Sequence, residues 1–264
     1  MIKTIWSLWL DGYDRAPPLV RACAQSWVER NRGDGWKVNL IDRGNLAAYI
    51  DDRQLAELTA GKTVSPASLS DIIRLELLAR HGGLWVDSTV FCQRPIEAWD
   101  FDPSSSGFFG FRHDSDRKLA SWLIYAEPGH HALERWHRRM REYVAGHNLI
   151  GAATPHLSIW RWRFGMREGQ YFWLHYLFGD LLRRDPRFAA EIAAMPQRSA
   201  RPMSRLQAMG LETSCTPQLQ AEIASLETPL QKLDWRARFP GDSSQSVLDF
   251  YMKQFAPSAQ GQAG

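Results

Sequence analysis

The amino-acid sequence predicts an α/β fold in which helices flank a mostly parallel central sheet. Apolar strand-like segments alternate with helical ones along the first half of the chain, as in sheets covered on both faces. One long helix ends at a glycine pair that leads straight into an apolar strand. With 264 residues and 44% hydrophobic content, the chain can bury a substantial core. We expect a single domain over 1–255 with a boundary between halves near 112, and a disordered tail over 256–264.

The N-terminal elements are expected to follow one another in a strand, helix, strand order. They are a strand over 4–10, a helix over about 17–31, a strand over 36–42 and short helices over 46–50 and 53–59. A turn at Asp11-Gly12-Tyr13 connects the first strand to the first helix. In α/β proteins with a mostly parallel sheet, ligands bind at the carboxyl ends of the strands.

The segment from Ser65 to Cys92 is the most informative part of the sequence. Ser65 is a suitable N-cap, Pro66 takes the first helical position, and Gly82-Gly83 provides the stop, so a helix of about four turns is expected. Its apolar side chains point nearly all round the axis, which predicts burial on most sides: Leu69, Ile72, Ile73, Leu75, Leu77 and Leu78.

Asp71 and Arg74 lie three residues apart on this helix and share a face. Charged groups on a mostly buried helix must be satisfied by each other, by backbone or by a ligand. An ordinary structural ion pair and a ligand-binding pair are both consistent with this spacing.

A polar triplet, Asp87-Ser88-Thr89, interrupts the apolar strand that runs over 84–91. Asp and Ser are poor residues for a central strand, so the interruption needs a cause. Carboxylate oxygen is a hard ligand that suits Mg²⁺ or Mn²⁺, and these ions bridge phosphate oxygens. The alternative is that the strand simply ends in a turn.

The second half of the chain is less regular. Strands are expected over 107–112 and 121–127, followed by an amphipathic helix over 130–144. The aromatic and arginine-rich segment 159–178 contains Trp160, Trp162 and His175, which suit either core packing or sugar binding, since aromatic faces stack on sugars. A histidine in such a helix is commonly structural, and both roles stay open.

Composition excludes several classes of protein. The formal net charge of +3 is too small to indicate nucleic-acid binding, and the basic clusters over 137–141, 161–167 and 201–205 are explained by a solvated face or by an anionic ligand. Three cysteines without metal-ligand spacing fit a reducing compartment.

The sequence lacks the motifs of several other enzyme classes and of targeted proteins. The P-loop, Rossmann and serine-hydrolase motifs are absent, as are a leader segment and a long apolar run. These features predict a cytoplasmic protein, at most peripheral to the inner membrane.

Two segments resemble a known family. The run SDIIRLELLARHGGLWVDSTVF resembles the signature of capsular polysaccharide synthesis proteins, which are related to DXD-containing sugar transferases of the mannosyltransferase and clostridial-toxin type. The opening KTIWSLWLDGYDRAPPLVRACAQSWVERN resembles the first strand and helix of the same family. The resemblance covers residues 1 to about 145 and implies a glycosyltransferase A-type fold, with 1–112 binding the nucleotide sugar and 113–255 forming a helical acceptor lobe.

The resemblance also implies a donor site. Trp9 would contact the nucleobase, Asp71 and Arg74 the ribose and phosphates, and Asp87 would be the first acid of the DXD motif. Thr89 replaces the second acid, so a divalent cation (Mn²⁺ or Mg²⁺) would be held by Asp87 and Thr89 together with diphosphate and water. Gly83 belongs to the same signature as part of the donor site.

The segment TPLQKLDWR, over 228–236, resembles a family motif with a lysine close to the diphosphate. Lys232 would stabilise the departing nucleotide, whereas Gln231 stands where relatives often carry His. The expected activity is sugar transfer from a nucleoside diphosphate sugar, with a UDP-sugar favoured, to a glycan or lipid-linked acceptor. Related enzymes retain the anomeric configuration. The departures at Thr89 and Gln231 leave a noncatalytic glycan-binding or scaffold protein on a transferase fold as the alternative.

Overall fold

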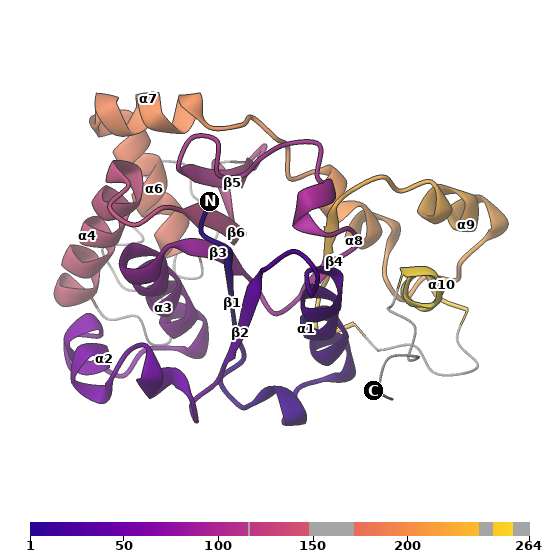
Figure 1. The fold of residues 1–264 in the computed structure, drawn as a ribbon, viewed down its shortest axis with the longest axis horizontal. Helices are drawn as coiled ribbons and strands as arrows, with labels where there is room; N and C mark the ends of the chain where they lie inside the picture. The colour runs from indigo at the N-terminus through magenta and orange to yellow at the C-terminus, as the bar shows by residue number, and fades with distance from the viewer. Residues whose placement is uncertain (116, 148–171, 238–244, 256–264) are drawn as a thin grey trace.

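A five-stranded sheet forms the centre of the protein (Figure 1). The computed structural model describes residues 1–115, 117–147, 172–237 and 245–255. The strand order is β2-β1-β3-β6-β5. The strands are β1 (Thr4–Leu8), β2 (Lys37–Ile41), β3 (Gly83–Val86), β5 (Phe108–Arg112) and β6 (Leu119–Ala126).

Most of these strands run in the same direction. β1 is parallel to β2 and β3, while β6 is antiparallel to β3 and β5, so four of the five strands point the same way. The predicted α/β class with a mostly parallel sheet is therefore confirmed. The reversed strand β6 separates β3 from β5, an order that the sequence pattern did not predict.

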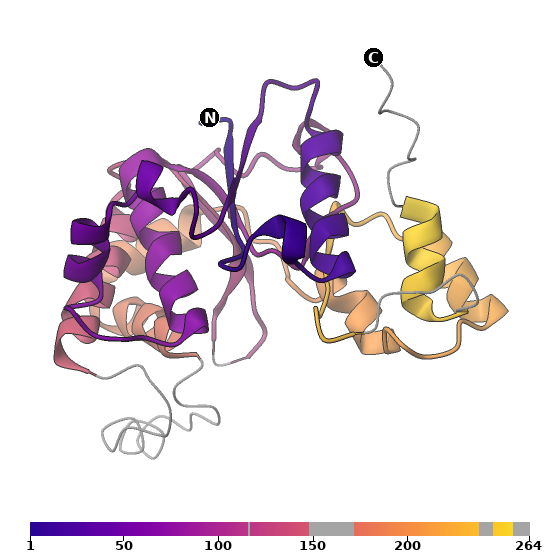
Figure 2. The ribbon, with the colours of Figure 1, turned by 90° about the horizontal axis from the view of Figure 1, so that it is seen from below.

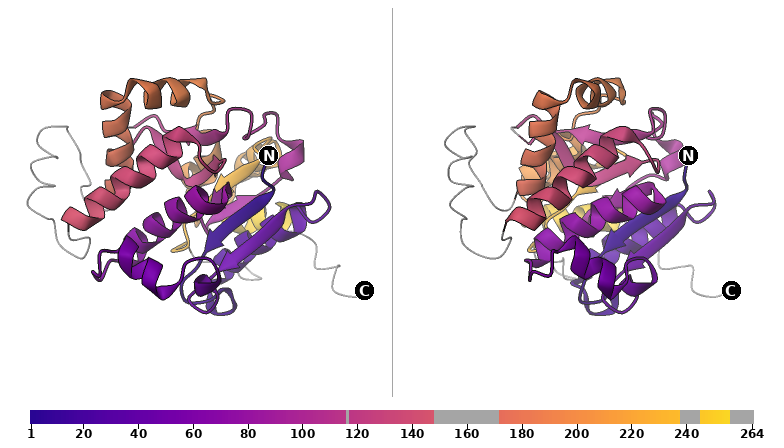
Figure 3. Two further views of the ribbon diagram at one scale, coloured as in Figure 1. Left: turned by 60° about the vertical axis from the view of Figure 1, so that its left-hand side comes forward. Right: turned by 90° about the vertical axis from the view of Figure 1, so that its left-hand side faces the viewer.

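Helices cover both faces of the sheet (Figures 1, 2 and 3). One face carries α2 (Asp52–Leu58), α3 (Pro66–His81), α4 (His131–Gly146), α6 (Trp173–Arg184) and α7 (Pro186–Ala194). The other side carries α1 (Pro18–Arg30), α8 (Arg205–Met209), α9 (Pro217–Ala224) and α10 (Val247–Phe255). Short 3₁₀ helices span Tyr13–Arg15, Leu46–Ala48, Ile96–Ala98 and Pro202–Ser204.

The central sheet has a hydrophobic core on each face, and the side chains of its strands point alternately into the two cores. Trp6 and Trp85 point into the core under α3 and α4, whereas Ile5 and Leu84 point into the core on the α1 side. Successive residues of a strand face opposite sides, so each central strand contributes to two hydrophobic layers. Burial on both faces explains why these strands are almost wholly apolar.

The helix α3 begins and ends as the sequence predicts. The Ser65 side chain accepts a hydrogen bond from the backbone N–H of Ser68, and Pro66 occupies the first turn. Gly82 caps the carboxyl end with a φ of 64°. Gly83 has a φ of 97°, and a Cβ atom at this position would lie 2.4 Å from the carbonyl oxygen of Thr4. The glycine pair thus turns the chain sharply into β3 and lets β3 approach β1 closely.

The interrupted strand over 84–91 is in fact two strands in two sheets. β3 belongs to the central sheet, while β4 (Val90–Cys92) pairs antiparallel with β7 (Leu230–Lys232) in a second sheet. The chain leaves the central sheet at Asp87. The backbone N–H of Asp87 still donates to the carbonyl of Trp122 in β6, whereas its own carbonyl accepts from the backbone N–H of Val90 across a turn. The polar triplet is therefore the crossing between two sheets.

The second half of the chain contributes to both sides of the sheet. α6 and α7 pack with α4, whereas α8 contacts β7 and α10 packs with α8 and α9. The tail over 256–264 lies outside the described residues. Among the helices that the structure describes, none combines the length and the apolar character needed to cross a membrane.

Candidate functional site

A cavity of about 840 Å³ opens at the carboxyl ends of β1 and β3. Its walls come from segments that are distant in the sequence, namely 8–11 after β1, 65–74 at the start of α3, 87–89 after β3 and 232–236 after β7. This is the edge at which α/β sheets bind ligands. Of the predicted site residues, Trp9, Asp71, Arg74, Asp87, Thr89, His175 and Lys232 line it.

Arg74 joins the two carboxylates of the site. Its Nη1 lies 2.9 Å from Asp71 Oδ1, and its Nη2 lies 2.9 Å from Asp87 Oδ1. The guanidinium is packed over the ring of Trp85, and its side chain is only 4% exposed. A buried cation that serves two carboxylates fixes their positions, so Arg74 acts first as a positioning residue. The predicted Asp71 and Arg74 pair is therefore structural and also part of the cavity wall.

Burial raises the pKa of the Asp71 carboxyl to about 7. Arg74 opposes this effect, but the same guanidinium also serves Asp87, whose negative charge raises the Asp71 pKa further. One cation thus compensates two carboxylates incompletely, and Asp71 holds its proton far more tightly than an ordinary aspartic acid.

This raised pKa gives a pH-dependent stability. An unfolded Asp releases its proton near pH ~4, whereas folded Asp71 keeps it until about pH 7. The native state therefore binds more protons between these values, and its stability falls as pH rises through them. We expect the free energy of unfolding of the wild type, minus that of Asp71→Asn, to decrease from pH ~4 to pH ~7 in urea titrations. A difference that increases over this range would contradict the prediction.

Asp87 is the carboxylate best placed to bind a ligand. Both of its hydrogen bonds, from Arg74 and from the indole N–H of Trp85 at 2.9 Å, use Oδ1. The side chain is 28% exposed at the cavity wall. Mg²⁺ is commonly held by one or two carboxylates together with substrate phosphates and water. Asp87 fits that role, although the described residues contain no cluster of three or more acidic, His or Cys ligands.

Thr89, the second predicted metal ligand, has a cationic neighbour. Its hydroxyl accepts a hydrogen bond from the ammonium group of Lys232, so a divalent cation bound to Thr89 would lie beside a positive charge. Lys232 also donates to the carbonyl of Leu233 at 3.0 Å. An ammonium group has three N–H donors, so one remains for a ligand. Burial lowers the pKa of Lys232, while the nearby charge of Asp87 acts in the opposite direction.

Two tryptophans form one side of the cavity. Trp9 follows β1 and Trp235 follows β7, with ring centroids 6.1 Å apart and planes at 71°. Trp235 is 46% exposed, which is exceptional for a large aromatic side chain in the described part of this protein. The sequence interpretation singled out Trp9 but missed Trp235, although Trp235 lies in the same short segment as Lys232.

Another part of the cavity wall contains His175, Arg117 and Phe172. The Arg117 guanidinium lies 4.4 Å from the centre of the Phe172 ring. Burial and the positive charges of Arg74 and Arg117 lower the pKa of His175 to about 3, so its imidazole is neutral at physiological pH. The sequence interpretation did not identify Arg117 or Phe172. Trp160 and Trp162 lie outside the described residues.

Two other residues of the predicted motifs lie away from the cavity surface. Gly83 is not part of the lining, and its close approach to Thr4 gives it a structural role. Gln231 is fully buried, where its side chain accepts from the backbone N–H of Leu206 and donates to Pro202 and Thr228. Gln231 therefore supports β7 and does not face the site.

Comparison with known proteins gives a family match over the part of the chain that forms most of this site. A family model described as "Capsular polysaccharide synthesis protein" matches residues 1–152. The O-glycosyltransferase braB of Annulohypoxylon truncatum is 30% identical over 151 residues, which are 51% of this chain and 36% of that protein. The putative glycosyltransferase HOC1 of Saccharomyces cerevisiae is 25% identical over 146 residues, 49% of this chain and 36% of that protein.

The match therefore spans little more than a third of the length of these curated relatives. Among solved structures, PaToxG Glycosyltransferase aligns with a TM-score of 0.43 at 12% identity, covering 96% of this chain and 86% of that chain.

Proposed function

Because the chain belongs to the capsular polysaccharide synthesis protein family, we propose that it is a glycosyltransferase. The proposed reaction moves a sugar from a nucleoside diphosphate sugar to a hydroxyl group of a polysaccharide or lipid-linked glycan. A UDP-sugar is the favoured donor, and the configuration at the anomeric carbon is retained, as in the related transferases. The two curated relatives named above carry glycosyltransferase in their names, which supports the class of activity.

The observation that carries this proposal is the convergence of the donor-site residues in one cavity. Trp9, Arg74, Asp87 and Lys232 come from four separate segments, and all of them line it. Lys232 is 143 residues away from Thr89 in the sequence, yet their side chains are hydrogen bonded. An aromatic ring, a carboxylate and a lysine around one cavity match the base, the metal-chelated diphosphate and the leaving charge of a nucleotide sugar.

Each residue has a distinct part in the proposed reaction. Trp9 offers a flat apolar face on which the base can stack. Asp87 would hold a divalent cation, which supplies charge stabilisation to the diphosphate when bound. Lys232 has one N–H left after its bonds to Thr89 and Leu233, and this N–H would donate to the departing nucleotide. Arg74 keeps Asp87 oriented through their ion pair and does not itself need to touch the phosphates.

The wall that contains His175 and Arg117 is the proposed acceptor side. A neutral imidazole can accept a hydrogen bond from a hydroxyl group, and Arg117 can donate to sugar oxygens. We place the protein in the cytoplasm with peripheral contact to a membrane. The three cysteines are free and buried, which supports a reducing compartment.

One observation favours a second candidate. Thr89 stands in the place of the second acidic ligand and is hydrogen bonded to Lys232, so the site has a reduced donor set for a metal. A noncatalytic glycan-binding protein on a transferase fold would tolerate such a loss. The two candidates differ in whether nucleotide sugars bind with metal and whether they are turned over.

A panel of nucleotide sugars tests the proposal. With Mn²⁺ present, a cognate donor at about 100 times its dissociation constant adds roughly 2.7 kcal/mol to the free energy of unfolding, which raises the melting temperature by roughly 5–10 °C. We expect the largest shift with a UDP-sugar, a smaller shift without Mn²⁺, and no shift for Trp9→Ala. Slow hydrolysis of the same donor should accompany binding. Binding of free glycans without any response to nucleotide sugars would support the noncatalytic candidate.

A further inference from the structure

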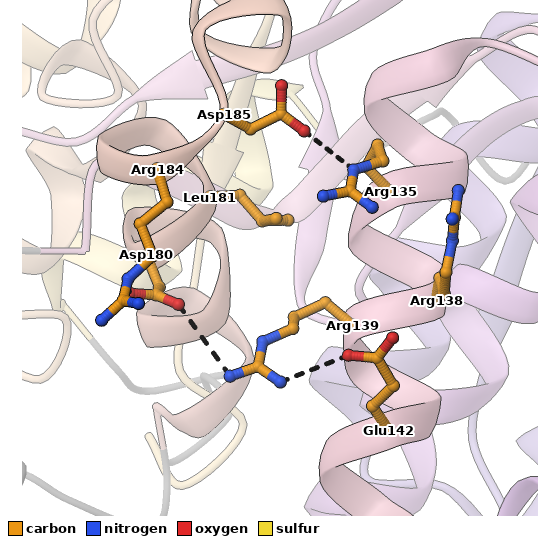
Figure 4. A pocket seen from close by; sticks show the side chains of 8 residues that line it. All are labelled: Arg135, Arg138, Arg139, Glu142, Asp180, Leu181, Arg184 and Asp185. Atoms are coloured by element: carbon orange, nitrogen blue, oxygen red, sulfur yellow. Dashed lines mark hydrogen bonds and ion pairs between the residues drawn. The ribbon is translucent and has the colours of Figure 1, made fainter.

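A second cavity, of about 270 Å³, lies between α4 and α6 and is rich in arginine (Figure 4). We call it the arginine pocket. Its lining consists of Arg135, Arg138, Arg139, Glu142, Asp180, Leu181, Arg184 and Asp185. No lining residue is shared with the donor cavity, and α6 contributes His175 to one cavity and Asp180 to the other. The arginine pocket is therefore a separate feature of the molecule.

Three of its four arginines are held by carboxylates. Arg135 pairs with Asp185 at 2.8 Å, and Arg184 pairs with the buried Asp180 at 2.8 Å. Arg139 lies between two acids, 3.3 Å from Glu142 and 3.9 Å from Asp180 (Figure 4). These contacts tie α4 to the end of α6 and hold the guanidinium groups around the pocket.

Arg138 differs from the other three. It lines the pocket from α4 but forms no ion pair with any residue in the described ranges, and no dashed line reaches it in Figure 4. The lining contains four arginines and three carboxylates, so it keeps an excess of one positive charge. Arg138 is exposed on α4, so its guanidinium can bind a ligand without breaking an ion pair, whereas Arg135 is paired with Asp185.

Guanidinium groups are suited to phosphate. Their planar N–H groups match two oxygens of a phosphate at once, and phosphate bonds of this kind are stronger than neutral hydrogen bonds. The volume of about 270 Å³ is roughly nine times the share of one liquid water, so a phosphate group has room. The side chains of Arg135 and Arg139 are each 33% exposed, which shows that the pocket is open to solvent.

We propose that the arginine pocket binds a phosphate group, with Arg138 as the residue that supplies the uncompensated charge. The proposal does not rest on the proposed transferase reaction, because the two cavities share no lining residue. The phosphate belongs either to a soluble phosphate compound or to the headgroup of an anionic phospholipid. Both sources present the same chemistry to Arg138.

Arg138→Gln is the test, and Arg141→Gln is its matched control. Arg141 lies on the same helix, is exposed, and is not part of the pocket lining. Each protein is titrated with inorganic phosphate at constant ionic strength in a calorimeter. Each is also sedimented with phosphatidylcholine vesicles, with and without phosphatidylglycerol. Equal melting temperatures in the absence of phosphate establish that both variants are folded.

We expect Arg138→Gln to weaken binding by about tenfold or more while Arg141→Gln binds like the wild type, since a hydrogen bond to a charged group is worth at least that factor. Loss confined to inorganic phosphate identifies a soluble ligand, and loss confined to phosphatidylglycerol vesicles identifies a lipid headgroup. Either result supports the site. Absence of binding to the wild type, or equal losses in the two variants, would overturn it, because equal losses indicate only diffuse surface charge.

Discussion

Asp87→Asn is expected to lower the turnover of a nucleotide sugar by at least about a hundredfold. The substitution removes the negative charge that would hold the divalent cation, while the amide oxygen can still accept from Arg74 and Trp85. Loss of several kcal/mol of charge stabilisation in the transition state corresponds to a factor of about 10²–10³. Donor transfer or hydrolysis, measured with and without Mn²⁺, gives the effect directly.

Asp52→Asn is the matched control for this prediction. Asp52 is exposed in the first turn of α2 and does not line the cavity, so the same isosteric change there should leave turnover unaltered. Melting temperatures of both variants show whether the fold is kept. Turnover of Asp87→Asn close to that of the wild type would refute the assignment of the donor site.

Gly83→Ala is expected to reduce the free energy of unfolding by about 2–5 kcal/mol. Two costs contribute. A positive φ of 97° is unfavourable for alanine by about 1–2 kcal/mol. The new Cβ would also lie 2.4 Å from the Thr4 carbonyl, and overpacking of this kind costs about 1–3 kcal/mol. Because the clash is with the backbone of β1, no side chain can move to relieve it.

Gly129→Ala separates these two costs. Gly129 also has a positive φ, of 77°, but a Cβ there would have no neighbour within 4 Å. This control should lose only the conformational part, about 1–2 kcal/mol. Urea unfolding followed by tryptophan fluorescence measures both variants. Equal losses at the two positions would mean that the approach of β3 to β1 contributes nothing beyond backbone strain.

The predictions from sequence were most accurate where structure is set by near neighbours. The cap at Ser65, the stop at Gly82 and the burial of α3 follow from local preferences, and all three are observed. The strand alternation that places Trp6 and Ile5 in different cores is also a local property. Helix and strand ends agree with expectation to within a few residues for the same reason.

The predictions were less accurate where distant segments decide the outcome. The strand over 84–91 divides between two sheets because β4 pairs with β7, which arrives from the far end of the chain. That pairing brings the ammonium group of Lys232 into hydrogen-bond contact with Thr89, which the sequence predicted only as a metal ligand. Arg117 was missed for a related reason, since it is remote in the sequence from Arg74, Asp87 and Lys232, with which it lines the cavity.

The α/β class and the long buried helix that ends at two glycines could be predicted from the sequence, because backbone preferences and hydrophobic periodicity act over a few residues. The residues expected at a nucleotide-sugar site came from the family resemblance. By contrast, the tertiary structure was needed to show that Arg74 links Asp71 to Asp87 and that Lys232 lines the same cavity. Such contacts depend on how sheets and helices pack, because a side chain meets its partner only after the chain has brought remote strands together.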